Sequence, residues 1–201
     1  RLSKSFKFIV TKHLDSFFLE ASFGRKFFFR GIYIDKFITN QADKIICISN
    51  QVKKYFSREI TQKNKYKTVY YGFSSKDFKH SSNIGIKLNS IRNRYNLKKN
   101  DIVLLNVARH VKQKSLKILL KAFSIYSKKQ DKAKLILVGN GRETNNLKKL
   151  AIELNINNRI CWINNYENIK DIFLLSNTFV LSSEYEGLGL VLLEAMSSKT
   201  P

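Results

Sequence analysis

The sequence predicts an α/β fold in which Rossmann-like parallel sheets carry helices on both faces. Its short runs of β-branched and aliphatic residues are continuous rather than alternating, which is typical of strands buried on both sides. Segments with apolar residues at helical spacing separate these runs. The chain has 201 residues, 43% of them hydrophobic, so it can bury a substantial core.

From about residue 44 onward, predicted strands and helices alternate along the chain. The strands are expected at 44–49, 66–71, 101–108, 133–139, 159–163 and 178–182. The helices are expected at 50–60, around 91–97, and at 115–129, 142–154, 166–176 and 190–198. Ser49 or Asn50 is placed to cap the first of them. Ligand sites in such sheets lie at the carboxyl ends of the strands, so the residues that follow each strand are the candidates for function.

Gly72 divides the chain into two parts with different character. Residues 1–72 are irregular, aromatic and basic, and we expect them to be the end of an N-terminal Rossmann-like domain. Residues 73–201 have the regular strand and helix pattern of a second, C-terminal domain. The chain begins at Arg1 and stops at Pro201 in mid-pattern, so we expect a fragment that is truncated at both ends.

Composition limits the classes of function. The net charge is +22, with the basic residues concentrated in residues 1–150, and such a field attracts nucleic acid, anionic lipid or phosphorylated substrates. A nucleic-acid-binding protein is the less favoured alternative, because lysine far outnumbers arginine and no basic recognition helix is apparent. No apolar stretch approaches the roughly 20 residues of a membrane span. Cys47 and Cys161 lie in apolar runs, and we expect buried free thiols in a reducing compartment.

Two of the candidate sites follow the strands at 101–108 and 133–139. Arg109 and Lys114 flank the start of the next helix, where two cations and a helix N-terminus would suit a diphosphate. Gly139 and Gly141 lie in a strand-to-helix turn, where a ligand can approach the backbone. Each pattern alone also fits an exposed basic face or an ordinary tight turn.

The third candidate follows the strand at 178–182, in the stretch EYEGLGLVLLEAM. Glu186 precedes two glycines at the start of a helix, and Glu194 lies about one turn into that helix. We expect this apolar helix to be buried. A buried carboxylate without a partner costs several kcal/mol, so Glu194 needs hydrogen-bond donors such as two vicinal hydroxyl groups. A salt bridge or simple exposure is the alternative.

Taken together and in order, these stretches resemble family 4 glycosyltransferases of GT-B fold. EGLGLVLLEAM is similar to the Glu-x7-Glu motif of that family, and NVARHVKQKSLKILLKAF and LILVGNGRETNNLKKLA are similar to its phosphate-binding and glycine-turn blocks. ADKIICISNQVKKYF and VYYGFSSKDF resemble the passage between its two domains. The resemblance covers about residues 42–201.

The chain departs from the family pattern at several positions. Ser115 and Lys199 each stand where the family has glycine, and Asn164 stands where a glycine usually ends a strand. Tyr71 and Ser74 replace the Asn and Asp of an N-G-x-D turn. None of these changes removes an ionic contact, but each can reshape the donor pocket.

The resemblance implies retaining transfer from a UDP- or GDP-sugar to a glycan or lipid-linked acceptor in cell-surface polysaccharide or lipopolysaccharide synthesis. Arg109 and Lys114 would neutralise the diphosphate, and Glu194 would accept the ribose hydroxyls. Glu186 would position the donor sugar. The backbone amides of Gly187, Leu188 and Gly189, with the turn at Gly139 and Gly141, would complete the donor site.

No cofactor or metal is expected, because the nucleotide sugar is a substrate and no Asp-x-Asp metal motif of the GT-A type occurs. An inactive sugar-nucleotide-binding subunit is the other reading of the same residues.

Two features of the N-terminal part complete the expectations. His13 follows an apolar run, as does a histidine that lies near the reacting sugar in the family, so the resemblance gives it a catalytic role; a chance surface histidine is the alternative. Residues 16–37 interleave phenylalanines with Arg25, Lys26 and Arg30, which suits either a domain core or an anionic membrane surface. We expect a cytoplasmic protein that binds peripherally to the inner face of the membrane.

Overall fold

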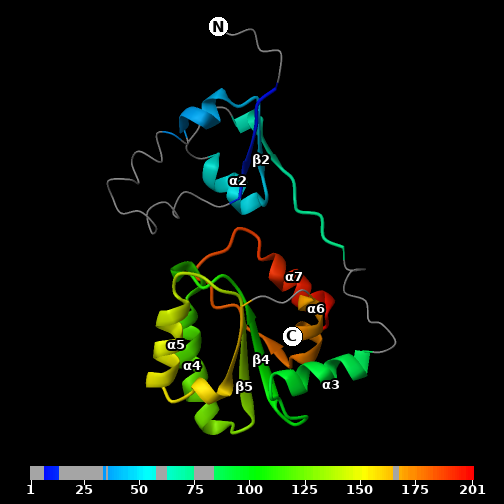
Figure 1. Cartoon of the computed structure of the whole chain (residues 1–201). Helices are drawn as coiled ribbons and strands as arrows, with labels where there is room; N and C mark the ends of the chain where they lie inside the picture. The colour runs from blue at the N-terminus through cyan, green and yellow to red at the C-terminus, as the bar shows by residue number, and fades with distance from the viewer. Residues whose placement is uncertain (1–6, 14–33, 35, 58–62, 75–83, 165–167) are drawn as a thin grey trace. The chain divides into compact units, whose positions relative to one another are not determined.

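The computed structural model describes residues 7–13, 34, 36–57, 63–74, 84–164 and 168–201 (Figure 1). The chain forms two compact units. One comprises residues 1–72 together with 186–188, and the other comprises residues 73–185 together with 189–201.

The first unit is built on a parallel sheet in the order β1-β2-β3. Its strands are β1 (Ile9–Lys12), β2 (Lys44–Cys47) and β3 (Tyr66–Thr68). Helix α2 (Asn50–Phe56) follows β2. Its N-cap is Ser49, whose Oγ accepts a hydrogen bond from the Val52 N–H at 3.2 Å. Ser49 was one of the two predicted candidates for this position. Val52 and Phe56 on α2 pack with Ile45 of β2 in the core of this unit.

The second unit contains a parallel sheet in the order β6-β5-β4-β7. The strands are β4 (Ile102–Val107), β5 (Ala133–Val138), β6 (Ile160–Ile163) and β7 (Thr178–Phe179). This confirms the predicted parallel arrangement. Strand β7 is shorter than expected, because the buried Asn106 side chain, rather than a backbone N–H, donates to the Val180 carbonyl at 2.8 Å.

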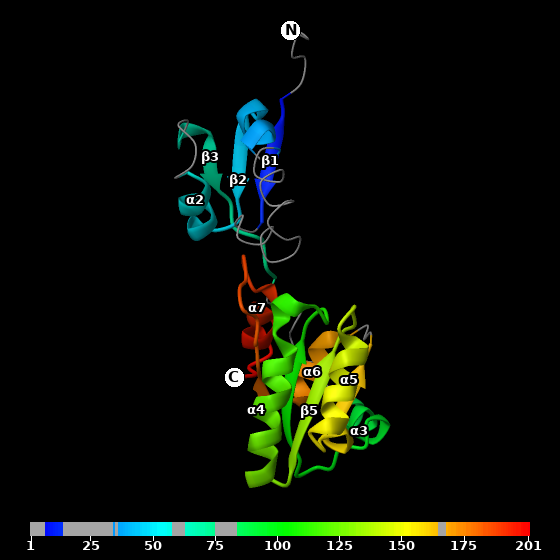
Figure 2. The same ribbon diagram turned by 90° about the vertical axis from the view of Figure 1, so that its left-hand side faces the viewer.

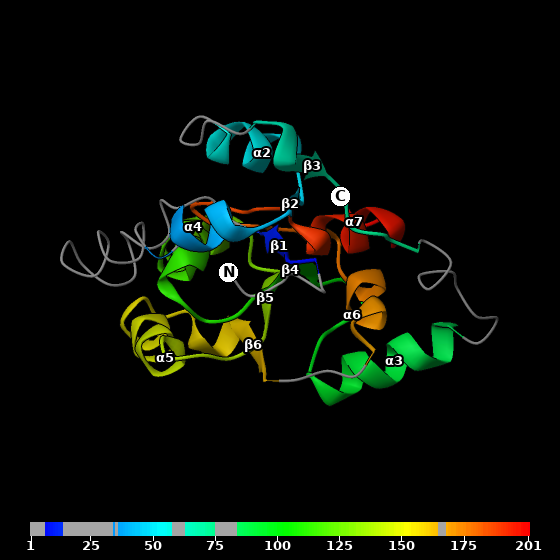
Figure 3. The same cartoon turned by 90° about the horizontal axis from the view of Figure 1, so that it is seen from above.

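Helices cover both faces of this sheet, as the continuous apolar strands predicted (Figures 1 and 2). Side chains alternate along β4, so Val103 and Leu105 enter one core while Leu104 packs against the other. Helices α4 (Leu116–Lys129) and α5 (Thr144–Glu153) cover the face of Leu104. Helices α3 (Ile84–Arg94), α6 (Ile169–Leu175) and α7 (Leu190–Ser197) cover the other face (Figure 3).

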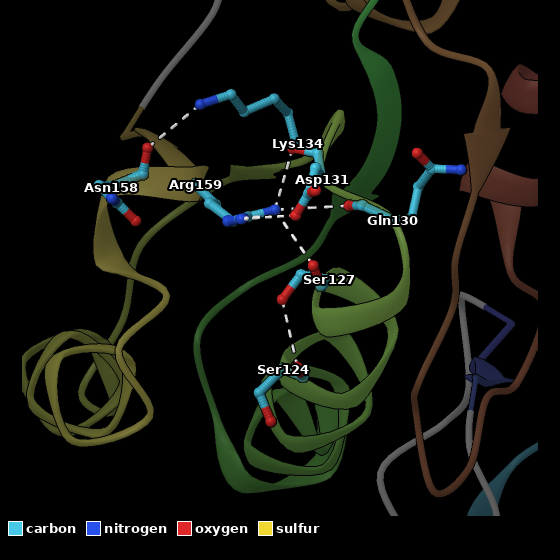
Figure 4. A network of polar contacts seen from close by, with 7 residues as sticks. All are labelled: Ser124, Ser127, Gln130, Asp131, Lys134, Asn158 and Arg159. Carbon is cyan, nitrogen blue, oxygen red and sulfur yellow. Dashed lines mark hydrogen bonds and ion pairs between the residues drawn. The ribbon is translucent and has the colours of Figure 1, made fainter.

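A polar network closes the edge of the sheet at which β5 and β6 begin (Figure 4). Arg159, the last residue of the short helix η4 (Asn157–Arg159), donates through Nη1 to the carbonyls of Ser127 and Asp131, at 3.1 and 3.0 Å. A third contact reaches the Gln130 carbonyl at 3.4 Å. These carbonyls belong to the last turn of α4 and the residues after it, which have no partner within the helix, so Arg159 acts as a C-terminal cap.

Both cysteines are free thiols, as expected. Cys47 is buried, whereas Cys161 is half-buried. No helix in the described part of the chain is long and apolar enough to cross a bilayer.

Candidate functional site

A cavity of about 580 Å³ opens where β4, β5 and β6 end. Its lining includes three residues that the sequence analysis assigned to the donor site, from three different loops and helices. Arg109 follows β4, Gly139 follows β5, and Glu194 lies on α7. Asn164, one of the departures from the family pattern, lines the same cavity after β6. The described fold therefore gathers residues that are up to 85 positions apart in the sequence, from Arg109 to Glu194, at one edge of the sheet.

Arg109 and Lys114 lie in one loop but are held differently. The ladder between β4 and β5 continues into this loop, because the Ala108 N–H donates to the Val138 carbonyl at 3.0 Å. Arg109 is exposed, and its side chain lines the cavity. Lys114 ends the short helix η3 (Lys112–Lys114) and is half-buried, outside the cavity lining. A basic side chain thus lies at the cavity and a second one lies five residues further along the same loop.

The turn at Gly139 and Gly141 packs directly on the backbone of the preceding loop. Both glycines have positive φ, 129° and 159°. A Cβ atom on Gly139 would lie 2.1 Å from the Ala108 carbonyl oxygen, and one on Gly141 would lie 2.5 Å from the His110 carbonyl oxygen. Side chains are therefore excluded at both positions by the contact between the two loops, whatever ligand approaches from outside.

Glu194 has the unusual environment that its sequence context indicated. Its carboxylate is half-buried and makes no hydrogen bond or ion pair with any residue that the structure describes. Burial raises the pKa of this carboxyl group above its ordinary value. The group faces the cavity, so a ligand with hydroxyl donors would supply the missing partners.

The expectation that α7 is a buried helix is wrong. Leu192 and Met196 are 41% and 72% exposed. Ala195 is the fully buried residue of the helix, and Val191 packs against the same core while partly exposed. The apolar run therefore packs only in part.

The segment that leads from β7 toward Glu186 is anchored on helix η3. Ser182 Oγ donates to the Lys114 carbonyl at 2.7 Å, and the Glu184 N–H donates to the Gln113 carbonyl at 2.9 Å. Gln113 Nε2 in turn donates to the Tyr185 carbonyl at 3.1 Å. Sequence reasoning did not single out Gln113, and an amide between two lysines offers no signal for this role.

The other predicted site residues are distributed over both units. Gly189 precedes α7 in the second unit, and Gly141 lies in the same turn as Gly139. Glu186, Gly187 and Leu188 belong to the first unit, and all three are half-buried.

His13 also belongs to the first unit. It is exposed directly after β1, and its Nδ1 is hydrogen-bonded to the hydroxyl of Tyr71, one of the residues that departs from the family pattern. The two rings lie 5.8 Å apart, centroid to centroid. Of the aromatic and basic segment 16–37, residues 16–33 and 35 lie outside the described residues, and these include Arg25, Lys26 and Arg30.

Within the described ranges, no three His, Cys, Asp or Glu side chains are grouped so that they could hold a metal ion. The basic residue in the cavity lining is Arg109 of the β4–α4 loop.

The comparison with known proteins agrees with the fold. Residues 89–201, more than half of the chain, match the family model described as glycosyl transferases group 1. The chain belongs to this family. A glycosyltransferase of Methanocaldococcus jannaschii is 30% identical over 83% of the chain, and the N-acetyl-alpha-D-glucosaminyl L-malate synthase of Bacillus anthracis is 27% identical over 83%. The chain spans 40% and 42% of the length of these two relatives.

A solved structure shows the same fold. HepE of Anabaena, in complex with UDP-glucose, matches 97% of the chain and 52% of its own length with a TM-score of 0.80 at 20% sequence identity. The GT-B fold expected from the resemblance is thereby confirmed.

Two departures from the family's glycines lie at positions with left-handed backbone. Ser115, between η3 and α4, has φ 48° and ψ 35°, and Lys199, after α7, has φ 57°. At Lys199 the N–H groups of Lys199 and Thr200 donate to the carbonyls of Met196 and Ala195, which is the hydrogen-bond pattern of a Schellman motif. The backbone that glycine would favour is therefore kept, at a conformational cost to the side chains.

We predict that Ser115→Gly stabilises the full-length protein by roughly 0.5–1 kcal/mol, because glycine adopts the left-handed conformation without the Cβ penalty. Ser90→Gly is the matched control, since Ser90 lies exposed within α3. There the same substitution should destabilise by about 0.5 kcal/mol. Urea unfolding of both variants measures the two shifts; a loss of stability in Ser115→Gly would contradict the strain assigned to this residue.

Proposed function

We propose that the protein containing this chain is a retaining glycosyltransferase. It transfers a sugar from a UDP- or GDP-sugar to a glycan or lipid-linked acceptor in the synthesis of cell-surface polysaccharide or lipopolysaccharide. The observation that carries the proposal is the cavity in which Arg109, Gly139 and Glu194 meet, the last with a carboxylate that has no partner among the described residues. The similarity of the fold to a protein bound to UDP-glucose supports a nucleotide sugar as the donor.

The residues around the cavity suit the parts of such a donor. A diphosphate carries the strongest charge of the molecule, and the exposed guanidinium of Arg109 can donate two parallel hydrogen bonds to it. Charge on the diphosphate grows as the sugar leaves, so Arg109 and Lys114 would stabilise the transition state more than the bound substrate. Gly139 lines the same cavity, so the donor can approach its backbone there.

Glu194 would bind the ribose. An ionised carboxylate is an acceptor, and two vicinal hydroxyls are donors at a matching spacing. Their hydrogen bonds would compensate the desolvation that raises the pKa of this group. The ligand thereby completes an interaction that the described protein residues leave open.

The remaining roles follow from the family motif. Glu186, with the backbone amides of Gly187, Leu188 and Gly189, would hold the donor sugar in position. His13 would lie near the reacting sugar, and the Tyr71 hydroxyl would fix the orientation of its ring.

We predict that Glu194→Gln weakens nucleotide binding, because an amide accepts hydrogen bonds from the ribose less strongly than a carboxylate. The loss should amount to roughly 1–3 kcal/mol, as is typical of hydrogen bonds to charged groups. Calorimetric titration of the full-length protein with UDP, GDP and ADP measures it, and the wild-type panel identifies the base. Glu153→Gln, an exposed glutamate at the end of α5, is the matched control. Equal affinity in wild type and Glu194→Gln would refute the assignment.

The same substitution should raise the stability of the free protein. The folded-state pKa of Glu194 is raised, so ionisation costs stability at pH values above the ordinary glutamate pKa, and glutamine removes this cost. Nucleotide affinity of the wild type should fall as the pH decreases through the raised pKa, and Glu194→Gln should lack this dependence.

Transfer is expected to need no divalent metal, because Arg109 and Lys114 supply the positive charge at the diphosphate. Activity of the full-length protein should therefore persist in EDTA, measured as sugar transferred or nucleoside diphosphate released. Loss of activity on chelation and its recovery with Mg²⁺ or Mn²⁺ would show that the phosphate site has been assigned wrongly.

We further infer a cytoplasmic location with peripheral attachment to the inner membrane face, supported by the net charge of +22. Each Lys or Arg near an anionic surface contributes about 1 kcal/mol. The full-length protein should cosediment with vesicles that contain anionic lipid and much less with neutral vesicles. Changing Arg25, Lys26 and Arg30 to Ser should reduce this binding without changing nucleotide affinity. If the protein does not cosediment with anionic vesicles at low salt, the membrane assignment is wrong and a soluble acceptor is favoured.

A further inference from the structure

His110 is a buried histidine beside the candidate donor site that no motif accounts for. It follows Arg109 directly, and the two side chains are in opposite environments. Arg109 is exposed at the cavity, whereas His110 is 1% exposed. A histidine is rarely buried without a hydrogen-bonding role, because its ring carries two polar nitrogens.

The hydrogen bonds of His110 reach into the turn after β5 and the start of α5. Its Nδ1 lies 2.9 Å from Thr144 Oγ1, and the same Oγ1 accepts a hydrogen bond from the Gly141 N–H at 3.0 Å. The backbone repeats the connection, because the His110 N–H donates to the Asn140 carbonyl at 2.8 Å and the His110 carbonyl accepts from the Glu143 N–H at 2.9 Å. One residue of the β4–α4 loop is thus bonded to Asn140, Glu143 and Thr144 of the β5–α5 connection.

These hydrogen bonds join the β4–α4 loop and the β5–α5 turn at the place where their backbones are in steric contact. A Cβ atom on Gly141 would lie 2.5 Å from the His110 carbonyl oxygen, so the two backbones touch. Steric contact fixes how closely the loops approach, but it does not stop one from sliding along the other. Hydrogen bonds from both the backbone and the ring of His110 fix the remaining freedom, since they are directional.

The surroundings of the ring favour its neutral form. Burial lowers the pKa of His110, and the charge of Lys148 on α5 lowers it further. Lys148 Nζ lies 5.9 Å from the centroid of the Trp162 ring, and that indole contacts the His110 ring edge-on at 6.0 Å. His110 Nε2 has no hydrogen-bond partner among the described residues, so a second ring proton would be buried without an acceptor.

We propose that His110 and Thr144 form a clamp that holds Arg109 and the Gly139–Gly141 turn in register, which makes His110 a positioning residue of the donor site. The proposal rests on the proposed function, because the register has a consequence only if a nucleotide binds there. A side chain one residue from the cationic group transmits small displacements to it directly. A shift of the loop would move the guanidinium away from the diphosphate while leaving the sheet intact.

The decisive variants remove the clamp and keep the packing. Thr144→Val is isosteric and lacks the hydroxyl, whereas Thr144→Ser retains it. His110→Phe fills the ring's space and preserves the contact with Trp162 but removes Nδ1. Thr178→Val is the matched control, because Thr178 is exposed on β7 and its hydroxyl makes no hydrogen bond with a described residue.

Affinity of the full-length protein for UDP, GDP and ADP, measured by calorimetric titration, tests the proposal. For the nucleotide that the wild type binds, Thr144→Val and His110→Phe should each weaken binding roughly 3- to 10-fold, as expected for one hydrogen bond. Thr144→Ser and Thr178→Val should remain within about twofold of the wild type. The double variant with both Thr144→Val and His110→Phe should have about the same affinity as the single variant that binds more weakly, because both changes break the same contact.

Steady-state kinetics separates positioning from a merely structural role. The clamp predicts a higher KM for the donor and an unchanged KM for the acceptor. Loss of folded protein alone would lower kcat and leave the donor KM unchanged. Wild-type affinity in both Thr144→Val and His110→Phe would overturn the proposal, and so would additive losses in the double variant. If the wild type binds none of the three nucleotides, the proposed function itself fails.

Discussion

The donor-site edge of the sheet depends on direct backbone contact between two loops. The segment after β4 and the turn after β5 approach until a single Cβ atom would lie 2.1 Å from a carbonyl oxygen at Gly139 and 2.5 Å at Gly141. This approach is possible because parallel strands end side by side, about 4.8 Å apart, so their connecting loops must either diverge or pack. Here the two loops pack against each other, and this contact fixes the backbone position of the exposed Arg109. The glycines of this turn are thus explained by the fold itself, and a ligand benefits from the rigidity they allow.

The sequence was informative where a pattern repeats along the chain. Continuous apolar strands such as β4 and β5 and the helical spacing in α4 predicted a parallel sheet covered on both faces, because each strand position must satisfy a neighbour on one face or the other. Residues at the strand ends were found by the same topological rule, and Arg109, Gly139 and Glu194 indeed line one cavity. Periodicity was less reliable for α7. An eight-residue helix whose residues are mostly apolar is expected to be buried, yet Leu192 and Met196 are exposed, since hydrophobic character alone does not specify which side meets the sheet.

Single residues without a repeating pattern were beyond sequence reasoning. Gln113 and His110 each bond to a loop distant in the chain, and no spacing rule connects Gln113 with Tyr185 or His110 with Thr144. The absence of glycine at Ser115 and Lys199 was visible, but its meaning was not. A serine or lysine in place of glycine suggests a changed backbone, whereas the structure keeps the left-handed conformation at both positions. Tertiary packing and the hydrogen bonds of the helix end therefore override the local preference of the residue, as happens when surrounding structure determines a strained conformation.

The two edges of the second unit's sheet treat polar groups differently, and the difference indicates where function lies. At the edge where β5 and β6 begin, Arg159 is surrounded by the carbonyls it can satisfy (Figure 4). At the opposite edge, Glu194 is desolvated without a partner among the described residues, and Ser115 adopts a conformation that disfavours its side chain. The desolvated carboxylate and the left-handed serine each lower the stability of the fold. Selection for stability alone would replace both residues with ones that suit these positions better. The desolvation of Glu194 at the carboxyl ends of the strands is the expected result if a bound ligand provides the missing hydrogen bonds.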